Sequence, residues 1–166
     1  KKSLSNLKYK NYKYYLINKN LNESNKLILI DIGACVGLRT IIINNYFNFK
    51  KIISIEPHIE NFKLLKQNTK HLRDKLDLHN FALGNEEKEG YLSLPFWFYK
   101  IKHVNHLGKW SLLGENNFFK KKVKIFKFDT FFKDCFNSKK YSYFIKIDVE
   151  GYETYVLEGM NEFLFK

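Results

Sequence analysis

Short aliphatic runs that end on a carboxylate constrain the fold of this chain more than any other feature. LILID at 27–31 is the first, and IISIE at 52–56 and YFIKID at 143–148 repeat the pattern. Each run is long enough for one buried strand and too short for an ordinary helix. Because a buried charge costs free energy unless something uses it, the acids at the strand ends are candidates for function.

Segments with helical spacing separate these runs. Residues 38–49 follow a glycine turn, and 59–72 place apolar residues on one side and lysines on the other. A further strand is expected at 76–83, and 153–165 is expected to form the last helix. This alternation predicts an α/β fold with a mostly parallel sheet and flanking helices.

The chain divides into two parts by composition. Residues 1–26 are polar with loosely spaced apolar positions, and we expect a docking helix followed by a linker. Residues 27–166 form the domain, with 91–122 as an insert of short strands and loops. If 143–151 is a central strand, a complete doubly wound domain needs C-terminal strands after it. We therefore expect either a trimmed domain or an edge covered by the insert or by another chain.

The formal charge of +12 would by itself suit a nucleic-acid partner. The basic residues are nearly all scattered lysines, with Arg39 and Arg73 the only arginines, which favours a solvated lysine-rich surface. No apolar run is long enough to cross a bilayer, and the first residues do not resemble a signal peptide. Cys35 and Cys135 fit a reducing compartment, so a cytoplasmic location is expected.

Polar residues gather at three strand ends. They are Asp31–Gly37, Glu56–Pro57–His58 and Asp148–Gly151. Ligands of parallel sheets bind beyond the carboxyl ends of the strands. We expect these three groups to face one crevice.

At the first strand end, Gly33 permits an unusual turn and Gly37 lets the next helix start close to a ligand. Cys35 stands at the middle glycine of the dinucleotide-binding fingerprint, so the turn is a weak signal for a nicotinamide cofactor. Asp31 would repel the pyrophosphate of such a cofactor, which binds at a helix N-terminus. The same carboxylate suits the ammonium and sulfonium of S-adenosylmethionine. An ordinary strand-to-helix turn is the alternative.

At the second strand end, Glu56 is well placed to accept hydrogen bonds from the ribose hydroxyls of an adenosine, or it is an exposed strand-end acid. At the third, Asp148 has Glu150 and Glu153 close by. Clustered carboxylates repel, so one of them could take a proton from an acceptor hydroxyl. They could also bind a metal or cap the next helix, and for Glu153 capping is an equal alternative.

Aromatic residues and histidines give weaker signals. Trp97 and Trp110 either stack on a sugar or base or form the core of the insert. The histidines show no metal-ligand spacing, so no metal site is predicted. His58 deserves a test because it follows the acid at the second strand end so closely.

Most of the chain, from about Leu27 to Met160, resembles the FkbM-type S-adenosylmethionine-dependent methyltransferases. The segments that carry the resemblance are DIGACVG, ISIEPHIENFKLLKQN, HNFALGN, FDTF and IKIDVEGYETYVLEGM. It implies a Rossmann-like class I methyltransferase fold and methylation of oxygen atoms, often on sugars, polysaccharides or polyketide-type products. The family commonly has asparagine where this chain has Cys35, and it has further strands after Met160.

The resemblance also implies roles by position. Glu56, with Pro57 beside it, would hold the ribose, and Asn80 to Ala82 would border the adenine. The methionine part of the cofactor would be flanked by Asp31, Gly33, Ala34 and Gly37.

Asp148 would lie next to the transferable methyl, with Glu150 nearby, as the catalytic pair. The sequence therefore predicts an S-adenosylmethionine-dependent O-methyltransferase acting on a small-molecule or glycan hydroxyl. The alternatives are an RNA ribose methyltransferase and a non-catalytic binding module with the same fold.

Overall fold

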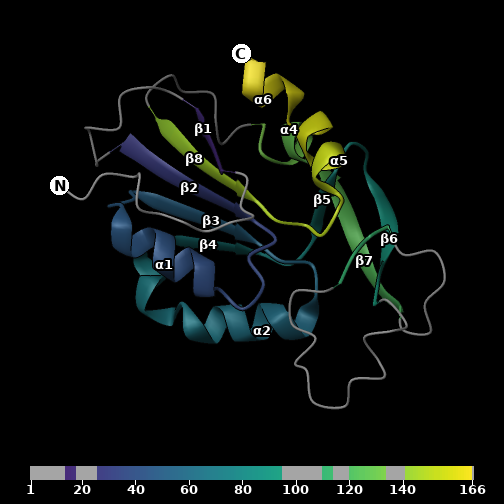
Figure 1. Ribbon diagram of the computed structural model, residues 1–166, viewed down its shortest axis with the longest axis horizontal. Helices are drawn as coiled ribbons and strands as arrows, with labels where there is room; N and C mark the ends of the chain where they lie inside the picture. Colours follow the sequence, from purple (N-terminus) through teal and green to yellow (C-terminus); the bar gives the residue numbers. More distant parts are fainter. Residues whose placement is uncertain (1–13, 18–25, 95–109, 114–119, 134–140, 166) are drawn as a thin grey trace.

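The computed structural model describes residues 14–17, 26–94, 110–113, 120–133 and 141–165 (Figure 1). Its early elements are β1 (Tyr14–Ile17), β2 (Leu27–Ile32), α1 (Leu38–Tyr46), β3 (Lys51–Ile55), α2 (Ile59–Asn68), the 3-10 helix η3 (Lys70–Lys75) and β4 (Leu76–His79). The later elements are β5 (Ala82–Gly84), β6 (Lys88–Ser93), β7 (Lys120–Lys127), α4 (Phe128–Phe131), β8 (Ser142–Ile147), α5 (Glu153–Glu158) and α6 (Asn161–Phe165).

A five-stranded sheet in the order β1-β8-β2-β3-β4 forms the centre of the molecule. Strands β8, β2, β3 and β4 run parallel, so the predicted α/β fold with a mostly parallel sheet is confirmed. Their carboxyl ends meet at one edge of the sheet, where the acids of β2, β3 and β8 were expected to converge.

Strand β1 differs from the helix expected in the N-terminal segment. Tyr14–Ile17 pairs antiparallel with β8, with Tyr14 opposite Lys146 and Ile17 opposite Tyr143. The edge of β8 is therefore covered by a strand from the start of the chain, and not by the insert or a second chain. At Tyr14–Ile17 a strand replaces the expected helix, because β8 offers backbone groups with which a short segment of β-forming residues can pair. Residues 1–13 and 18–25 lie outside the described part.

Helices cover both faces of this sheet (Figure 1). Alternating residues of β2 explain the arrangement, because successive side chains of a strand point to opposite faces. Ile28, Ile30 and Ile32 belong to a core with residues of α4, α5 and α6, whereas Leu27 and Leu29 pack with residues of α1 and η3. Both faces of β2 are buried, as its continuous aliphatic sequence requires.

A second sheet, in the order β5-β7-β6, stands beside the first. The stretch 76–83, expected as one strand, is divided: β4 pairs with β3, and β5 leaves to pair with β7. Strands β6 and β7 are antiparallel neighbours, and Ser93 bridges to Ser111. Within its described residues, the insert thus has the expected short strands. Residues 95–109 and 114–119, with Trp97, lie outside the described part.

The expected helix 153–165 is also divided. Glycine is needed at Gly159 because a Cβ there would overlap the carbonyl oxygen of Gly84. α5 ends at this close approach, and α6 starts where the Asp129 carboxylate accepts the backbone N–H groups of Glu162 (2.8 Å) and Phe163 (3.0 Å). No helix in the described residues has the length and apolar character to cross a membrane.

Candidate functional site

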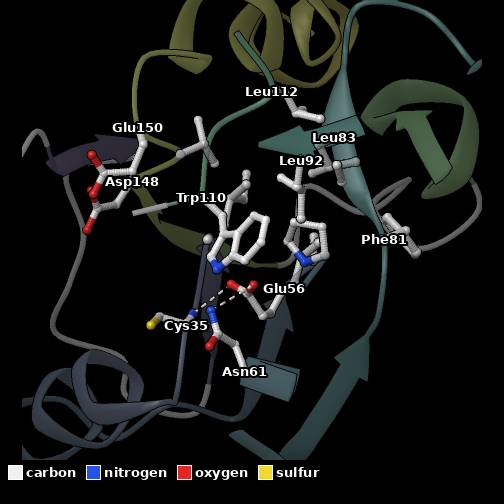
Figure 2. Close-up of a pocket in the computed structure, with 16 residues that line it drawn as sticks. Cys35, Glu56, Asn61, Phe81, Leu83, Leu92, Trp110, Leu112, Asp148 and Glu150 are labelled. Carbon is white, nitrogen blue, oxygen red and sulfur yellow. Dashed lines mark hydrogen bonds between the residues drawn. The ribbon is translucent and has the colours of Figure 1, made fainter. Parts of the chain in front are cut away.

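A cavity opens beyond the carboxyl ends of β2, β3 and β8, between the two sheets (Figure 2). Its volume is about 650 Å³ when the part open to solvent is included. Apolar side chains form most of its wall, and they come from both sheets and from the insert: Ile32, Ile55, Phe81, Leu83, Leu92, Leu112 and Val149. The charged residues of the wall, within the described chain, are Glu56, Asp148 and Glu150.

The glycine turn after β2 lies between the end of β3 and the loop after β8 and contacts both. Gly33 has φ +75°, and its N–H and that of Ala34 donate to the Ile55 carbonyl at 2.9 and 3.0 Å. A Cβ on Gly33 would lie 2.9 Å from the carbonyl carbon of Asp148 and closer still to its oxygen. Glycine is thus required for two reasons, the left-handed backbone and the contact with the loop after β8.

Glu56 lies in the cavity wall at the end of β3 and is 6% exposed. Its carboxylate accepts the backbone N–H of Cys35 at 2.9 Å and that of His58 at 2.9 Å, and the Asn61 side-chain amide at 3.5 Å. Burial raises the pKa of this carboxyl, and the two backbone donors oppose the rise. Glu56 therefore links the glycine turn after β2 to the start of α2 and contributes to the wall of the cavity.

Asp31 does not reach the cavity. It is fully buried on the α1 side of the sheet, where one oxygen accepts the Thr40 hydroxyl at 2.5 Å. The other oxygen is 2.9 Å from the Lys146 ammonium. Asp31 is not among the residues that line the cavity, because alternation along β2 turns its side chain to the α1 side, and its predicted contact with the cofactor stays a prediction. Lys146, which sequence reasoning missed, is signalled by a lysine inside the aliphatic run YFIKI.

Asp148 and Glu150 lie in the loop after β8 and line the cavity. Asp148 is half-exposed, and Glu150 has φ +52° with its carbonyl accepting the Ser111 hydroxyl at 2.9 Å. Glu153 has a different role: its carboxylate accepts the N–H groups of Val149 and Gly151, both at 3.3 Å. Glu153, in the first turn of α5, thus holds the preceding loop, although among the described residues no side chain caps the helix by a hydrogen bond.

Trp110 and Leu112 from the insert line the cavity. In Figure 2 the Trp110 indole is drawn between Asp148 and Glu56. Its ring stacks on His58 with centroids 4.5 Å apart and an angle of 27° between the planes. Burial lowers the pKa of His58, and the positive charge of Lys121 lowers it further. The His58 imidazole that packs against the Trp110 indole is thus the neutral form.

The remaining predicted residues divide into two groups. Pro57 and Ala82 line the cavity with Gly33, whereas Gly37 packs on α2, where a Cβ would lie 2.7 Å from Leu65 Cδ1. Ala34 is buried in the turn, and its described contact is the backbone hydrogen bond to β3. The Asn80 side chain donates to the carbonyls of Glu56 (2.8 Å) and Pro57 (3.1 Å), so it braces the end of β3.

The sequence profile of the Methyltransferase FkbM domain matches residues 31–166, which include every residue that lines the cavity. The chain belongs to the FkbM methyltransferase domain family. The resemblance drawn from the five sequence segments is confirmed. The cavity at the strand ends thus lies within an FkbM methyltransferase domain.

A solved structure supports the same fold. The chain is similar to the crystal structure of a methyltransferase FkbM from Methylobacillus flagellatus KT, with a TM-score of 0.54 and 16% sequence identity. The similarity covers 83% of this chain and 30% of that chain, so this sequence spans less than a third of the other protein's length. No curated protein matches this FkbM-type chain significantly. Because the sequence identity is 16%, the structural similarity shows a shared fold and nothing more specific.

Proposed function

We propose that this chain, with 27–166 as its catalytic domain, is an S-adenosylmethionine-dependent O-methyltransferase. Its acceptor would be a hydroxyl of a sugar, a polysaccharide or a related metabolite, and its location cytoplasmic. The observation that carries the proposal is a cavity at the strand ends of an FkbM-type domain whose charged wall residues, in the described chain, are carboxylates. Such a wall favours a cationic ligand with a polar sugar and disfavours an anionic one.

The residues present fit S-adenosylmethionine better than a nicotinamide dinucleotide. Glu56 presents buried carboxylate oxygens of the kind that accept hydrogen bonds from ribose hydroxyls. Phe81 and Pro57 offer apolar surface for an adenine, and Asp148 offers a negative charge for an ammonium or sulfonium. A pyrophosphate would meet Glu56 and Asp148 with no lysine or arginine in the described wall to neutralise it. When bound, the cofactor would supply an activated methyl group.

The chain's own residues would align and deprotonate the acceptor. Asp148 and Glu150 lie on the same loop, and either carboxylate can accept a hydroxyl proton as the oxygen attacks the methyl. The apolar walls and Trp110 restrict water and limit the orientations of the acceptor. The aromatic ring also suits a sugar face, which supports a glycan or sugar acceptor over a small apolar alcohol.

Calorimetry with S-adenosylhomocysteine tests the cofactor assignment. The unmodified chain should bind it, and Glu56→Ala should weaken binding by about tenfold or more, the effect of losing hydrogen bonds to a charged group. Glu60→Ala is a matched control, because Glu60 is an exposed acid on α2 that pairs with Lys63 at 3.0 Å. Binding unchanged by Glu56→Ala would contradict the proposal. Transfer of a radiolabelled methyl group to a crude glycan extract tests the acceptor class.

A further inference from the structure

Lys146 is the most unusual side chain near the cavity. It lies near the carboxyl end of β8, an interior strand of the main sheet, and is 2% exposed, although lysine is almost never fully buried without a partner. Its ammonium lies 2.9 Å from Asp31 Oδ1, donates to the Gly33 carbonyl at 2.6 Å and lies 3.8 Å from Asp148 Oδ2. One buried cation thus contacts the ends of two neighbouring strands.

The hydrogen bond from Lys146 to the Gly33 carbonyl does more than neutralise the charge of the lysine. An ion pair with Asp31 alone would balance the charge of Lys146, and it would leave the Gly33 carbonyl without this donor. The donated hydrogen bond fixes the carbonyl side of the turn, while the N–H side is fixed by the Ile55 carbonyl. Gly33 and Asp148 both line the cavity, so the position of the ammonium determines the shape of the wall at this point.

We propose that Lys146 is the positioning residue of the cofactor site, with Asp31 as its counterion. It holds the Gly33 carbonyl and the Asp148 carboxylate in the arrangement that receives the methionine part of the cofactor. The inference deepens the proposed function and rests on it. It also gives Asp31 a role: the acid at the end of β2 supports Lys146 from the buried side and leaves Asp148 to face the ligand.

A double variant separates positioning from stability. Lys146→Met alone leaves the Asp31 carboxylate buried without a counterion, which is strongly destabilising, whereas removing both charges is often tolerated. We expect Asp31→Asn/Lys146→Met to melt closer to the unmodified chain than Lys146→Met does. Its affinity for S-adenosylhomocysteine should nevertheless stay about tenfold or more below that of the unmodified chain, because no donor reaches the Gly33 carbonyl.

The control is Asp77→Asn/Lys51→Met. This pair joins neighbouring strands at 2.9 Å as well, but both side chains are partly exposed and neither lines the cavity. We expect the control to bind S-adenosylhomocysteine with unchanged affinity.

A double variant at Asp31 and Lys146 that binds as tightly as the unmodified chain would overturn the positioning role and leave the proposed function intact. An unmodified chain that does not bind would instead overturn the proposed function. If Asp31→Asn/Lys146→Met does not fold, Asp31→Leu/Lys146→Met replaces the ion pair by an apolar pair. Its affinity for S-adenosylhomocysteine is then compared with that of the unmodified chain in the same way.

Discussion

Replacing Gly33 with alanine tests how closely the ends of β2 and β8 must approach. A Cβ at this position would overlap the backbone of Asp148, well inside the 3.0 Å that real Cβ atoms essentially never cross. The overlap is with backbone, so a side-chain rotation cannot relieve it. The loop after β8 has to move by close to an ångström, and the hydrogen bond from the Asp148 N–H to the Ile32 carbonyl, 3.0 Å long, is then lost or weakened.

Three contributions determine how much Gly33→Ala lowers the free energy of unfolding. The left-handed backbone at φ +75° costs an alanine about 1 kcal/mol, the lost hydrogen bond costs about 1 kcal/mol, and overpacking costs about 1–3 kcal/mol. The smaller conformational freedom of unfolded alanine offsets about 0.4–1 kcal/mol. We therefore expect Gly33→Ala to lower the free energy of unfolding by about 3 kcal/mol, or Tm by about 6–12 °C.

Gly151→Ala is the matched control. Gly151 also has a positive φ, +100°, but a Cβ there meets only Leu113 Cδ1, at 3.2 Å. It should therefore show the backbone cost of about 1 kcal/mol without the overlap. The same unfolded-state offset of about 0.4–1 kcal/mol applies, so the net loss should be less than about 1 kcal/mol. Urea unfolding followed by circular dichroism measures both variants. Equal losses for Gly33→Ala and Gly151→Ala would refute the argument that close backbone approach determines the turn.

Three further predictions concern single side chains. Asp129→Ala should lower the free energy of unfolding by about 1–2 kcal/mol in a urea titration, because two N–H groups of α6 lose their acceptor; an unchanged midpoint would contradict this. The raised pKa of Glu56 means that the folded chain holds this proton more tightly, so stability should fall as pH rises from about 4.3 through the folded pKa. In Glu56→Gln that fall, measured as Tm against pH, should disappear, and an identical profile would exclude Glu56 as its source. In a Trp97→Phe variant, protonation of His58 on acidification should quench the fluorescence of Trp110, because the two rings are stacked. The midpoint should lie below about pH 6.5, since burial lowers the pKa of His58. A midpoint at or above that value would contradict the stacked, buried imidazole.

The sequence predicted the parallel core well because the pattern there is local. The aliphatic strands and amphipathic helices carry their periodicity within a few residues, and the acids at the strand ends marked the edge of the sheet. Glu56 and Asp148 were assigned to a shared cavity on that basis, and both line it. The family resemblance rested on the same segments and is confirmed by the profile match over residues 31–166.

What the sequence left open depends on contacts between distant residues. Asp31 and Lys146 are far apart in the chain, and only their opposite positions on β2 and β8 make them an ion pair. The breaks at 80–81 and at Gly159 likewise arise from close packing between elements, since β5 has to leave the main sheet and its Gly84 carbonyl meets the end of α5. Strand β1 could not be predicted because its pairing partner lies at the other end of the chain.

The pairing of β1 with β8 has a consequence for biosynthesis. Of the described strands, β8 leaves the ribosome last, yet it fills the gap between β1 and β2, which leave first. Until then both early strands expose open hydrogen-bonding edges, which are prone to pair with other chains. A nascent chain of this topology should therefore depend on chaperone protection until β8 is translated, and the pairing of β8 between β1 and β2 should be slow in vitro for a domain of this size.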